Sequence, residues 1–297
     1  MTAAALTAPA GSAPGAVPGD AGTPGAIEFR DVAITYGGKV PYTAVRGVSL
    51  QVQPGEFVAV VGPSGCGKST LIKLVAGLLG ASEGTSRVLG SLRPTPGKVG
   101  IAFQNASLLP WRSVLQNVLL PLEVAPQHKR AYRQNPAPYI ERARALLRSV
   151  GLEGAEGKNA WELSGGMQQR VNLCRALIHE PEILLLDEPF GALDAFTREE
   201  LWMALQDVWT QRRPTVMLIT HDLREATLLA DTVYIMGGRP GGIVMRRAVD
   251  LPRPRTLEGT FDAPFVEHVR VLRDAIGHQH GGKTLRFSPV AGPEGGA

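Results

Sequence analysis

The amino-acid sequence predicts an α/β fold with a parallel or mixed sheet at its core, and three observations support this. The apolar stretch 57–61 is followed by a glycine-rich turn and then by an apolar helical pattern, the order strand, loop, helix. The stretches 183–186 and 215–219 are typical of strands buried on both faces. Between these two stretches, apolar residues at helical spacing over 201–209 predict a helix that packs on the sheet.

The composition narrows the class of protein. The chain has 297 residues, 44% of them hydrophobic, and two cysteines. This supports one or two packed domains and excludes a small disulfide-stapled domain or a wholly disordered chain. A formal net charge of +4 lacks the dense basic surface of a nucleic-acid-binding protein, so no nucleic-acid partner is expected. No apolar run approaches the roughly 20 residues of a membrane-spanning helix, so a soluble chain is expected.

Three regions follow from the distribution of residue types. Residues 1–26 are almost all Ala, Gly, Pro, Ser or Thr and are expected to form a disordered tail. No basic residue precedes Arg30, which argues against a secretory signal and favours the cytosol. A globular domain is expected over residues 27–251. A short C-terminal extension is expected over residues 252–297, with one helix at 263–276.

Within the domain, β-like patterns predict strands at 27–34 and 45–52, and the helix after the glycine-rich turn has its apolar residues over 71–79. Residues 114–151 have helical periodicity and are interpreted as a helical insertion. Within it, the polar segment 127–138 is expected to be a solvated loop without a role. The buried stripe of the insertion is predicted to comprise Tyr139, Ile140, Ala143, Leu146, Leu147 and Val150.

The glycine-rich turn carries the strongest chemical signal. Residues 62–69 fit the phosphate-binding pattern G-x-x-x-x-G-K-[ST] without a mismatch, between a predicted strand and a predicted helix. Backbone N–H groups and the positive end of the helix dipole bind phosphate oxygens there. Lys68 is expected to reach the terminal phosphates, and Ser69 to offer its hydroxyl to Mg²⁺. The expected nucleotide contacts are Gly62, Pro63, Ser64, Gly65, Cys66, Gly67, Lys68, Ser69 and Thr70.

The two cysteines are interpreted differently. Cys66 lies at the start of the helix that follows the loop, where the helix dipole favours a thiolate, so chemical sensitivity without a catalytic role is expected. Cys174 lies in an apolar helical pattern and is expected in the core. Both should be reduced in the cytosol.

Two acidic residues end the predicted strand 183–186. Because ligands bind at the carboxyl ends of parallel strands, Asp187 and Glu188 are expected to lie beside the phosphate loop. Asp187 suits Mg²⁺, directly or through water. Glu188 is placed to polarise a water that attacks the γ-phosphate.

A second glycine-containing segment, Leu163-Ser164-Gly165-Gly166, precedes another helical pattern. Its position predicts an anion site at a helix N-terminus, but Ser164 would serve equally well as an N-cap. The spacing leaves both interpretations open.

In this order, the motifs from about residue 27 to residue 251 resemble those of the ATP-binding subunit of an ABC transporter. The resemblance implies an antiparallel β subdomain and a helical subdomain over about 105–178 beside the sheet core of a P-loop NTPase. The LSGG segment resembles the family signature, which implies that Ser164 and Gly166, with Gly165 and Gln168, contact ATP held by a second copy. Further matches to family motifs are the Q-loop Gln104, implied in catalysis and metal binding, the D-loop Asp194, the switch His221 and the adenine-stacking Tyr36.

The resemblance also implies a mechanism and partners. Two copies would associate head to tail, each ATP lying between residues 62–70 of one and 164–168 of the other. Glu188 would activate water, supported by His221, while Lys68 and Mg²⁺ stabilise the transferring phosphoryl group. The stroke would be delivered to separate membrane permease subunits near residues 104–117, at the cytoplasmic face of the inner membrane, and indirectly serve a solute-binding protein.

Three segments bear on transport direction and cargo. Met167 and Pro189–Asp194 are similar to bacterial importers. Ala106–Trp111 and Gly237–Gly241 resemble the nitrate, sulfonate and taurine importer branch, which implies uptake of a small anion. Leu108, Leu109 and Trp111 could instead be an apolar patch that docks any membrane partner.

Other cargoes and classes stay open. The related systems include importers of thiamine-precursor pyrimidines. A soluble ABC ATPase acting on ribosomes or DNA is disfavoured by the single phosphate loop and the lack of a long heptad run. A GTPase is disfavoured by the LSGG segment.

Overall fold

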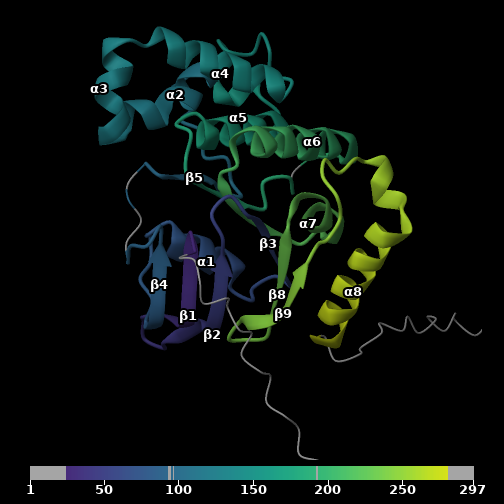
Figure 1. The fold of residues 1–297 in the computed structure, drawn as a ribbon. Helices are drawn as coiled ribbons and strands as arrows, with labels where there is room; N and C mark the ends of the chain where they lie inside the picture. The colour runs from purple at the N-terminus through teal and green to yellow at the C-terminus, as the bar shows by residue number, and fades with distance from the viewer. Residues whose placement is uncertain (1–24, 93–94, 96, 192, 280–297) are drawn as a thin grey trace, which may run out of the picture.

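The computed structural model describes residues 25–92, 95, 97–191 and 193–279, and these form two sheets with helices around them (Figure 1). The expected tail up to residue 24 and the extension from residue 280 lie outside the described residues. Among the described helices, none combines the length and apolar character needed to cross a membrane.

The larger sheet has six strands in the order β5-β6-β7-β3-β8-β9, all parallel except β9, which pairs antiparallel with β8. The predicted α/β fold with a mixed sheet is therefore confirmed. The strands are β3 (Phe57–Val61), β5 (Val99–Ala102), β6 (Ile183–Asp187), β7 (Thr215–Thr220), β8 (Thr232–Gly237) and β9 (Gly242–Ala248). Every residue of β3, β6, β7 and β8 is buried, which is the pattern of parallel strands covered on both faces.

The smaller sheet is antiparallel, in the order β2-β1-β4, with β1 (Ile27–Tyr36), β2 (Tyr42–Val52) and β4 (Glu83–Val88). This confirms the antiparallel β subdomain. The strands predicted at 27–34 and 45–52 are present and run two to three residues further at one end. The motifs used in the sequence analysis did not identify β4, β5, β8 or β9.

Side chains of the larger sheet point alternately to two hydrophobic clusters. Phe57, Ala59 and Val61 of β3 belong to the cluster shared with helices α2 and α4 to α8, while Val58 and Val60 belong to the cluster shared with α1 and the smaller sheet. This alternation follows from the two-residue period of a strand. The larger sheet is therefore the common layer between both cores.

Four helices flank or follow strands of the larger sheet: α1 (Lys68–Val75), α6 (Ala195–Arg212), α7 (Leu223–Leu229) and α8 (Ala263–Gln279). The helix expected at 263–276 is therefore present. A separate helical group lies at the end of the molecule opposite the smaller sheet (Figure 1). It contains α2 (Val114–Val124), α3 (Pro126–Gln134), α4 (Ala137–Ser149) and α5 (Gly165–Leu177). A short 3-10 turn at Ala160–Glu162 precedes α5, and another at Glu258–Phe261 precedes α8.

One local prediction in this helical group is wrong. The segment 127–138 was expected to be a loop, but most of it forms α3 and the start of α4. Pro126 occupies the first helical position of α3, where its fixed φ suits the helix and its missing N–H is not needed. Tyr132 of α3 packs edge-on against Tyr139 of α4, with ring centroids 5.7 Å apart. Helix–helix packing thus stabilises a polar helix that has no fully buried residue.

The predicted stripe of the insertion is confirmed in part. Ala143, Leu147 and Val150 are buried, whereas Tyr139, Ile140 and Leu146 are only half-buried. The buried three belong to the hydrophobic cluster that also contains residues of α2 and α5, and the others pack against it.

Candidate nucleotide-binding site

Four neighbouring strands deliver the candidate site to one edge of the larger sheet. In the parallel register, Ala102 pairs with Leu186, Asp187 with Ile219, and Val61 with Thr220. The chain leaves these strands at almost the same level. The residues that follow are Phe103-Gln104 after β5, Glu188 after β6, His221 after β7 and Gly62 after β3. Segments far apart in the sequence therefore meet at the carboxyl edge, where α/β sheets bind ligands.

The loop between β3 and α1 can take its shape only with glycine at particular positions. Gly65 has φ +79° and Gly67 has φ +94°. A Cβ at Gly67 would also lie 2.5 Å from Cγ1 of Val45. A Cβ at Gly62 would lie 2.1 Å from the carbonyl oxygen of Met236. Glycine is therefore required both by the left-handed backbone and by the close approach of β2 and β8.

Lys68 bridges this loop. Its side chain is buried, and its Nζ donates to the carbonyl oxygens of Gly62 at 2.7 Å and Pro63 at 3.0 Å. A buried ammonium with two neutral carbonyl partners is available to an anion that enters the loop. The role expected of Lys68 toward terminal phosphates stays a prediction.

Ser69 and Asp187 are brought together across the site. Ser69 Oγ donates to Asp187 Oδ1 at 3.0 Å. Burial raises the pKa of the Asp187 carboxyl, the Ser69 hydrogen bond lowers it, and the neighbouring Glu188 raises it further. The ionised carboxylate is therefore incompletely compensated, and an adjacent cation would complete its environment. Hydroxyl and carboxylate oxygens are hard donors that suit Mg²⁺.

Glu188 is the meeting point of the remaining predicted catalytic residues. Its Oε2 lies 3.4 Å from Nε2 of Gln104 and 3.4 Å from Nδ1 of His221. Glu188 has φ +47°, an unusual conformation for a residue with a side chain, and its backbone N–H donates to Ile219 O at 2.9 Å. Strained backbone of this kind is maintained by surrounding structure and clusters at functional sites. The half-buried carboxylate is thereby held between two polar side chains from neighbouring strands.

Tyr36, at the end of β1, lies at the rim of this site. Its hydroxyl is 3.3 Å from Oγ1 of Thr70 in the first turn of α1. The contact places the ring beside the helix that follows the loop.

The LSGG segment begins α5. Ser164 Oγ accepts a hydrogen bond from the backbone N–H of Met167 at 3.3 Å, so the N-cap interpretation is confirmed, while the anion-binding interpretation stays a prediction. Gln168 Nε2 donates to the carbonyl oxygens of Ala160 at 3.0 Å and Leu163 at 3.4 Å, which shapes the approach to the helix. A Cβ at Gly166 would lie 2.8 Å from Cδ2 of Leu193, whereas a Cβ at Gly165 would meet no atom of the described residues within 4 Å.

Asp194 starts α6 in the same way. Its carboxylate accepts from the backbone N–H of Thr197 at 3.0 Å, and that hydrogen bond lowers the pKa of Asp194. Among the described residues, no hydrogen bond or ion pair joins Asp194 or residues 164–168 to residues 62–70. One chain thus assembles Lys68, Ser69, Gln104, Asp187, Glu188 and His221 at the sheet edge, but not the LSGG segment or Asp194.

The chemical sensitivity expected of Cys66 is contradicted by the structure, and the core position expected of Cys174 is confirmed. Cys66 is buried, and this burial raises the pKa of its thiol despite the opposing effect of Lys68. Desolvation therefore outweighs the helix N-terminus, so the buried site disfavours the thiolate. Cys174 lies in the core, where burial raises its pKa to about 12.

The contact between Gly237–Gly241 and the phosphate loop was not predicted from the sequence. Arg239 donates to the carbonyl oxygen of Ser64 at 3.4 Å, and a Cβ at Gly241 would lie 1.8 Å from the carbonyl oxygen of Cys66. The segment reaches the loop because β8 is parallel to β3 and ends at the same edge. Recognising β8 as a buried strand would have been the signal for this contact.

Comparisons with known proteins agree with the geometry. The ABC transporter family matches residues 45–191. The chain is 42% identical over 228 residues to the taurine import ATP-binding protein TauB of Escherichia coli (strain K12), covering 76% of this chain and 86% of TauB. It is 45% identical over 220 residues to the aliphatic sulfonates import ATP-binding protein SsuB of Bacillus licheniformis, covering 74% of this chain and 82% of SsuB.

A solved structure shares the fold. It is an ATP-binding cassette described as a dimer in a post-hydrolysis state bound to ADP and Pi. The TM-score is 0.65 with 27% sequence identity, and the match covers 76% of this chain and all of that one.

We predict that Gly241→Ala weakens nucleotide binding. The added methyl group would overlap the Cys66 carbonyl and displace the loop, so ATP affinity should fall about tenfold or more, since overpacking a tight contact costs about 1–3 kcal/mol. A titration with a fluorescent ATP analogue measures the affinity. Gly37→Ala is the matched control, because a Cβ there meets nothing within 4 Å. Equal affinities for the two variants would contradict the prediction.

We predict that Asp187→Asn stabilises the nucleotide-free, Mg²⁺-free protein. The folded-state pKa of Asp187 is raised, so its ionisation costs stability above that pKa, and this cost disappears as the pH falls through it. At pH 7 the melting temperature should rise by about 2–4 °C, and the gain over wild type should shrink on acidification. Exposed Asp207→Asn is the control for thermal melting. A gain that does not depend on pH would exclude this cause.

Proposed function

Since the chain belongs to the ABC transporter ATP-binding proteins, we propose that it is the ATP-hydrolysing subunit of a bacterial importer for taurine or a related small sulfonate. The proposal of ATP hydrolysis rests on the position of Glu188. Its carboxylate lies 3.4 Å from both Gln104 and His221, beside the phosphate loop. The names of the similar proteins TauB and SsuB support the cargo.

The phosphate loop and α1 provide the nucleotide site. Backbone N–H groups of residues 62–70 and the Lys68 ammonium bind the phosphates, because the loop concentrates hydrogen-bond donors and positive charge at one place. Tyr36, next to Thr70, is positioned to stack on the base. Arg239 adds a second cationic group on the outer side of the loop, where it holds the Ser64 carbonyl.

The residues at the sheet edge fit Mg²⁺. Ser69 and the incompletely compensated Asp187 would hold it, with Gln104 nearby on the Glu188 side. When bound, Mg²⁺ neutralises negative charge on the phosphate oxygens.

Glu188 acts as the base in this proposal. Its Oε2 orients the attacking water and accepts its proton, while Gln104 Nε2 and His221 Nδ1 keep the carboxylate in place. The His221 side chain is 65% exposed, so it can also approach the transferring phosphoryl group. Lys68 stabilises the charge that develops on the phosphoryl oxygens.

Part of the site must come from a second copy. Among the described residues of one chain, no hydrogen bond or ion pair joins the LSGG segment, with Ser164 at the N-terminus of α5, to residues 62–70. The solved relative is a dimer, which supports a head-to-tail pair in which Ser164, Gly165, Gly166, Gln168 and Asp194 of one copy complete the site of the other. Isolated chains should then bind ATP but hydrolyse it slowly.

The surface for the permease subunits is proposed around residues 104–117. Trp111 is 73% exposed, and Leu108 and Leu109 are half-buried beside it. Asn117, fully buried, holds this loop by donating to the carbonyl oxygens of Leu109, Arg112 and Ser113. A rigid loop with an exposed tryptophan is suited to binding another protein. The chain would thus lie on the cytoplasmic face of the inner membrane, its ATP-binding domain spanning 27–251, and serve a solute-binding protein indirectly.

We predict that Glu188→Gln retains ATP binding and accumulates a closed dimer. The amide keeps the shape of the side chain but cannot accept the proton of water, so ATP stays intact between the two copies. ATP turnover and size-exclusion chromatography with ATP and Mg²⁺ measure the two effects. The exposed Glu200→Gln is the control and should behave as wild type. Normal turnover by Glu188→Gln would remove Glu188 from the role of base.

We predict that host cells lacking this chain lose taurine or alkanesulfonate uptake. Accumulation of labelled taurine, an alkanesulfonate, nitrate and a thiamine-precursor pyrimidine would be compared in cells complemented with wild type or Glu188→Gln. Only wild type should restore sulfonate uptake. Restoration of nitrate or pyrimidine uptake instead would overturn the cargo while leaving the ATPase assignment intact.

A further inference from the structure

The short helix α7 runs from His221, at the carboxyl edge of the larger sheet, to the opposite edge, where β8 begins. His221 follows β7 directly, and Asp222 is the N-cap of α7, accepting from the backbone N–H groups of Arg224 and Glu225 at 2.8 and 3.2 Å. The backbone N–H of Asp222 donates to Oγ1 of Thr220 at 2.9 Å. The position of His221 therefore depends on the amino end of α7, which the chain enters directly after it.

The carboxyl end of α7 is closed by two arginines from residues 252–279, the described part of the C-terminal extension. The last carbonyl groups of a helix lack partners within the helix. Arg255 donates to the carbonyl oxygens of Thr227 at 2.8 Å, Leu228 at 3.2 Å and Ala230 at 2.7 Å. Arg253 donates to that of Leu229 at 2.6 Å. All four terminal carbonyls are thus satisfied from outside the helix.

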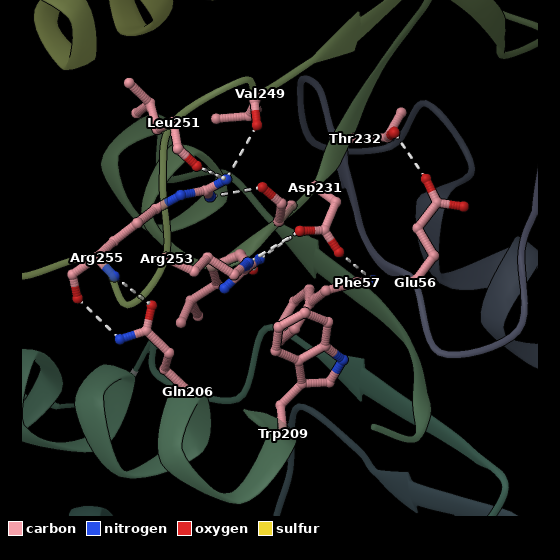
Figure 2. Close-up of polar contacts among 12 residues, drawn as sticks. Glu56, Phe57, Gln206, Trp209, Asp231, Thr232, Val249, Leu251, Arg253 and Arg255 are labelled. Atoms are coloured by element: carbon pink, nitrogen blue, oxygen red, sulfur yellow. Dashed lines mark hydrogen bonds and ion pairs between the residues drawn. The ribbon is translucent and has the colours of Figure 1, made fainter. Parts of the chain in front are cut away.

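Arg255 is itself held from two sides, as Figure 2 shows. Gln206 of α6 donates to its carbonyl oxygen at 2.8 Å and accepts from its backbone N–H at 3.1 Å. The guanidinium also donates to Val249 at 3.0 Å and Leu251 at 3.4 Å. Since α6 starts at Asp194, Arg255 joins the helices that follow Asp194 and His221.

Arg253 is fixed by charge and stacking. It forms an ion pair with Asp231 at 2.8 Å and lies over the ring of Trp209, 4.2 Å from its centroid (Figure 2). Asp231 also accepts from the backbone N–H of Phe57 at 3.0 Å, at the start of β3. This contact ties the arginine to the strand that leads into the phosphate loop.

The charge of Arg255 faces a helix end instead of a carboxylate. Within the described residues it forms no ion pair, and burial lowers its pKa to about 10, so it stays protonated near neutral pH. A cation is favoured at the negative end of a helix dipole. Replacement of the guanidinium by an apolar side chain would leave these buried carbonyl oxygens without their donors.

We propose that Arg255, assisted by Arg253, is a positioning residue for His221. It acts through α7: with both ends fixed, the seven-residue helix holds His221 at the level of Glu188, and without the arginine the helix frays from its carboxyl end. A helix this short has few internal hydrogen bonds and depends on such external contacts. The inference rests on the proposed function, in which His221 supports hydrolysis.

The test compares Arg255→Met, Arg255→Lys and the control Arg270→Met in the full chain. Arg270 is exposed on α8, where it forms ion pairs with Glu267 and Asp274 of the same helix. Turnover per folded ATP site should fall about tenfold in Arg255→Met, with ATP affinity within about twofold of wild type. Arg255→Lys should fall less, because it keeps the charge but not the fork. Amide hydrogen exchange of residues 222–230 should accelerate in Arg255→Met and not in Arg270→Met.

A double variant separates positioning from a general loss of stability. If Arg255 acts through His221, Arg255→Met should not lower single-turnover hydrolysis further in a His221→Ala chain. A full additional decrease there, or unchanged turnover per folded site in Arg255→Met alone, would overturn the proposal. If His221→Ala by itself leaves hydrolysis unchanged, the proposed catalytic role of His221 fails instead.

Discussion

The parallel pairing of β5, β6, β7 and β3 is the constraint on which the rest of the molecule depends. It brings four strand ends to one level, so Gln104, Glu188, His221 and Gly62 become neighbours although they are spread over the chain. Parallel strands need long connections, and those connections here are the helices that cover both faces. The site and the two hydrophobic cores are therefore consequences of one sheet.

Charged side chains are compensated differently at the two edges of that sheet. At the carboxyl edge, burial raises the pKa of Asp187, and among the described residues Lys68 donates to the carbonyl oxygens of Gly62 and Pro63. The nucleotide and the cation that we propose for this site would supply the opposite charges. At the other edge, Arg255 is satisfied by carbonyl groups and Arg253 by Asp231. The helix α7 runs between these edges. Through it, we propose, Arg253 and Arg255 affect the position of His221.

Much of the site was predictable because motifs such as G-x-x-x-x-G-K-[ST] between a strand and a helix are typical of few structures other than a phosphate loop. The phosphate loop lies between strand and helix as expected, and Asp187 and Glu188 end β6 beside it. Misjudgements arose where packing outweighs local chemistry. Burial reverses the effect of the helix N-terminus on Cys66, and packing between Tyr132 and Tyr139 accompanies a helix in a polar segment that was expected to be a loop. The roles of individual site residues stay predictions.

By itself, the sequence determined the α/β class, the phosphate loop, the acidic strand end and the family, since these depend on short patterns with a local physical meaning. Only the tertiary structure decided that Glu188 faces Gln104 and His221, that Gly241 abuts Cys66, and that Arg255 closes α7. Such contacts join residues tens to more than a hundred positions apart. They depend on the strand order and on the packing of segments that are distant in the sequence, which a local pattern does not specify.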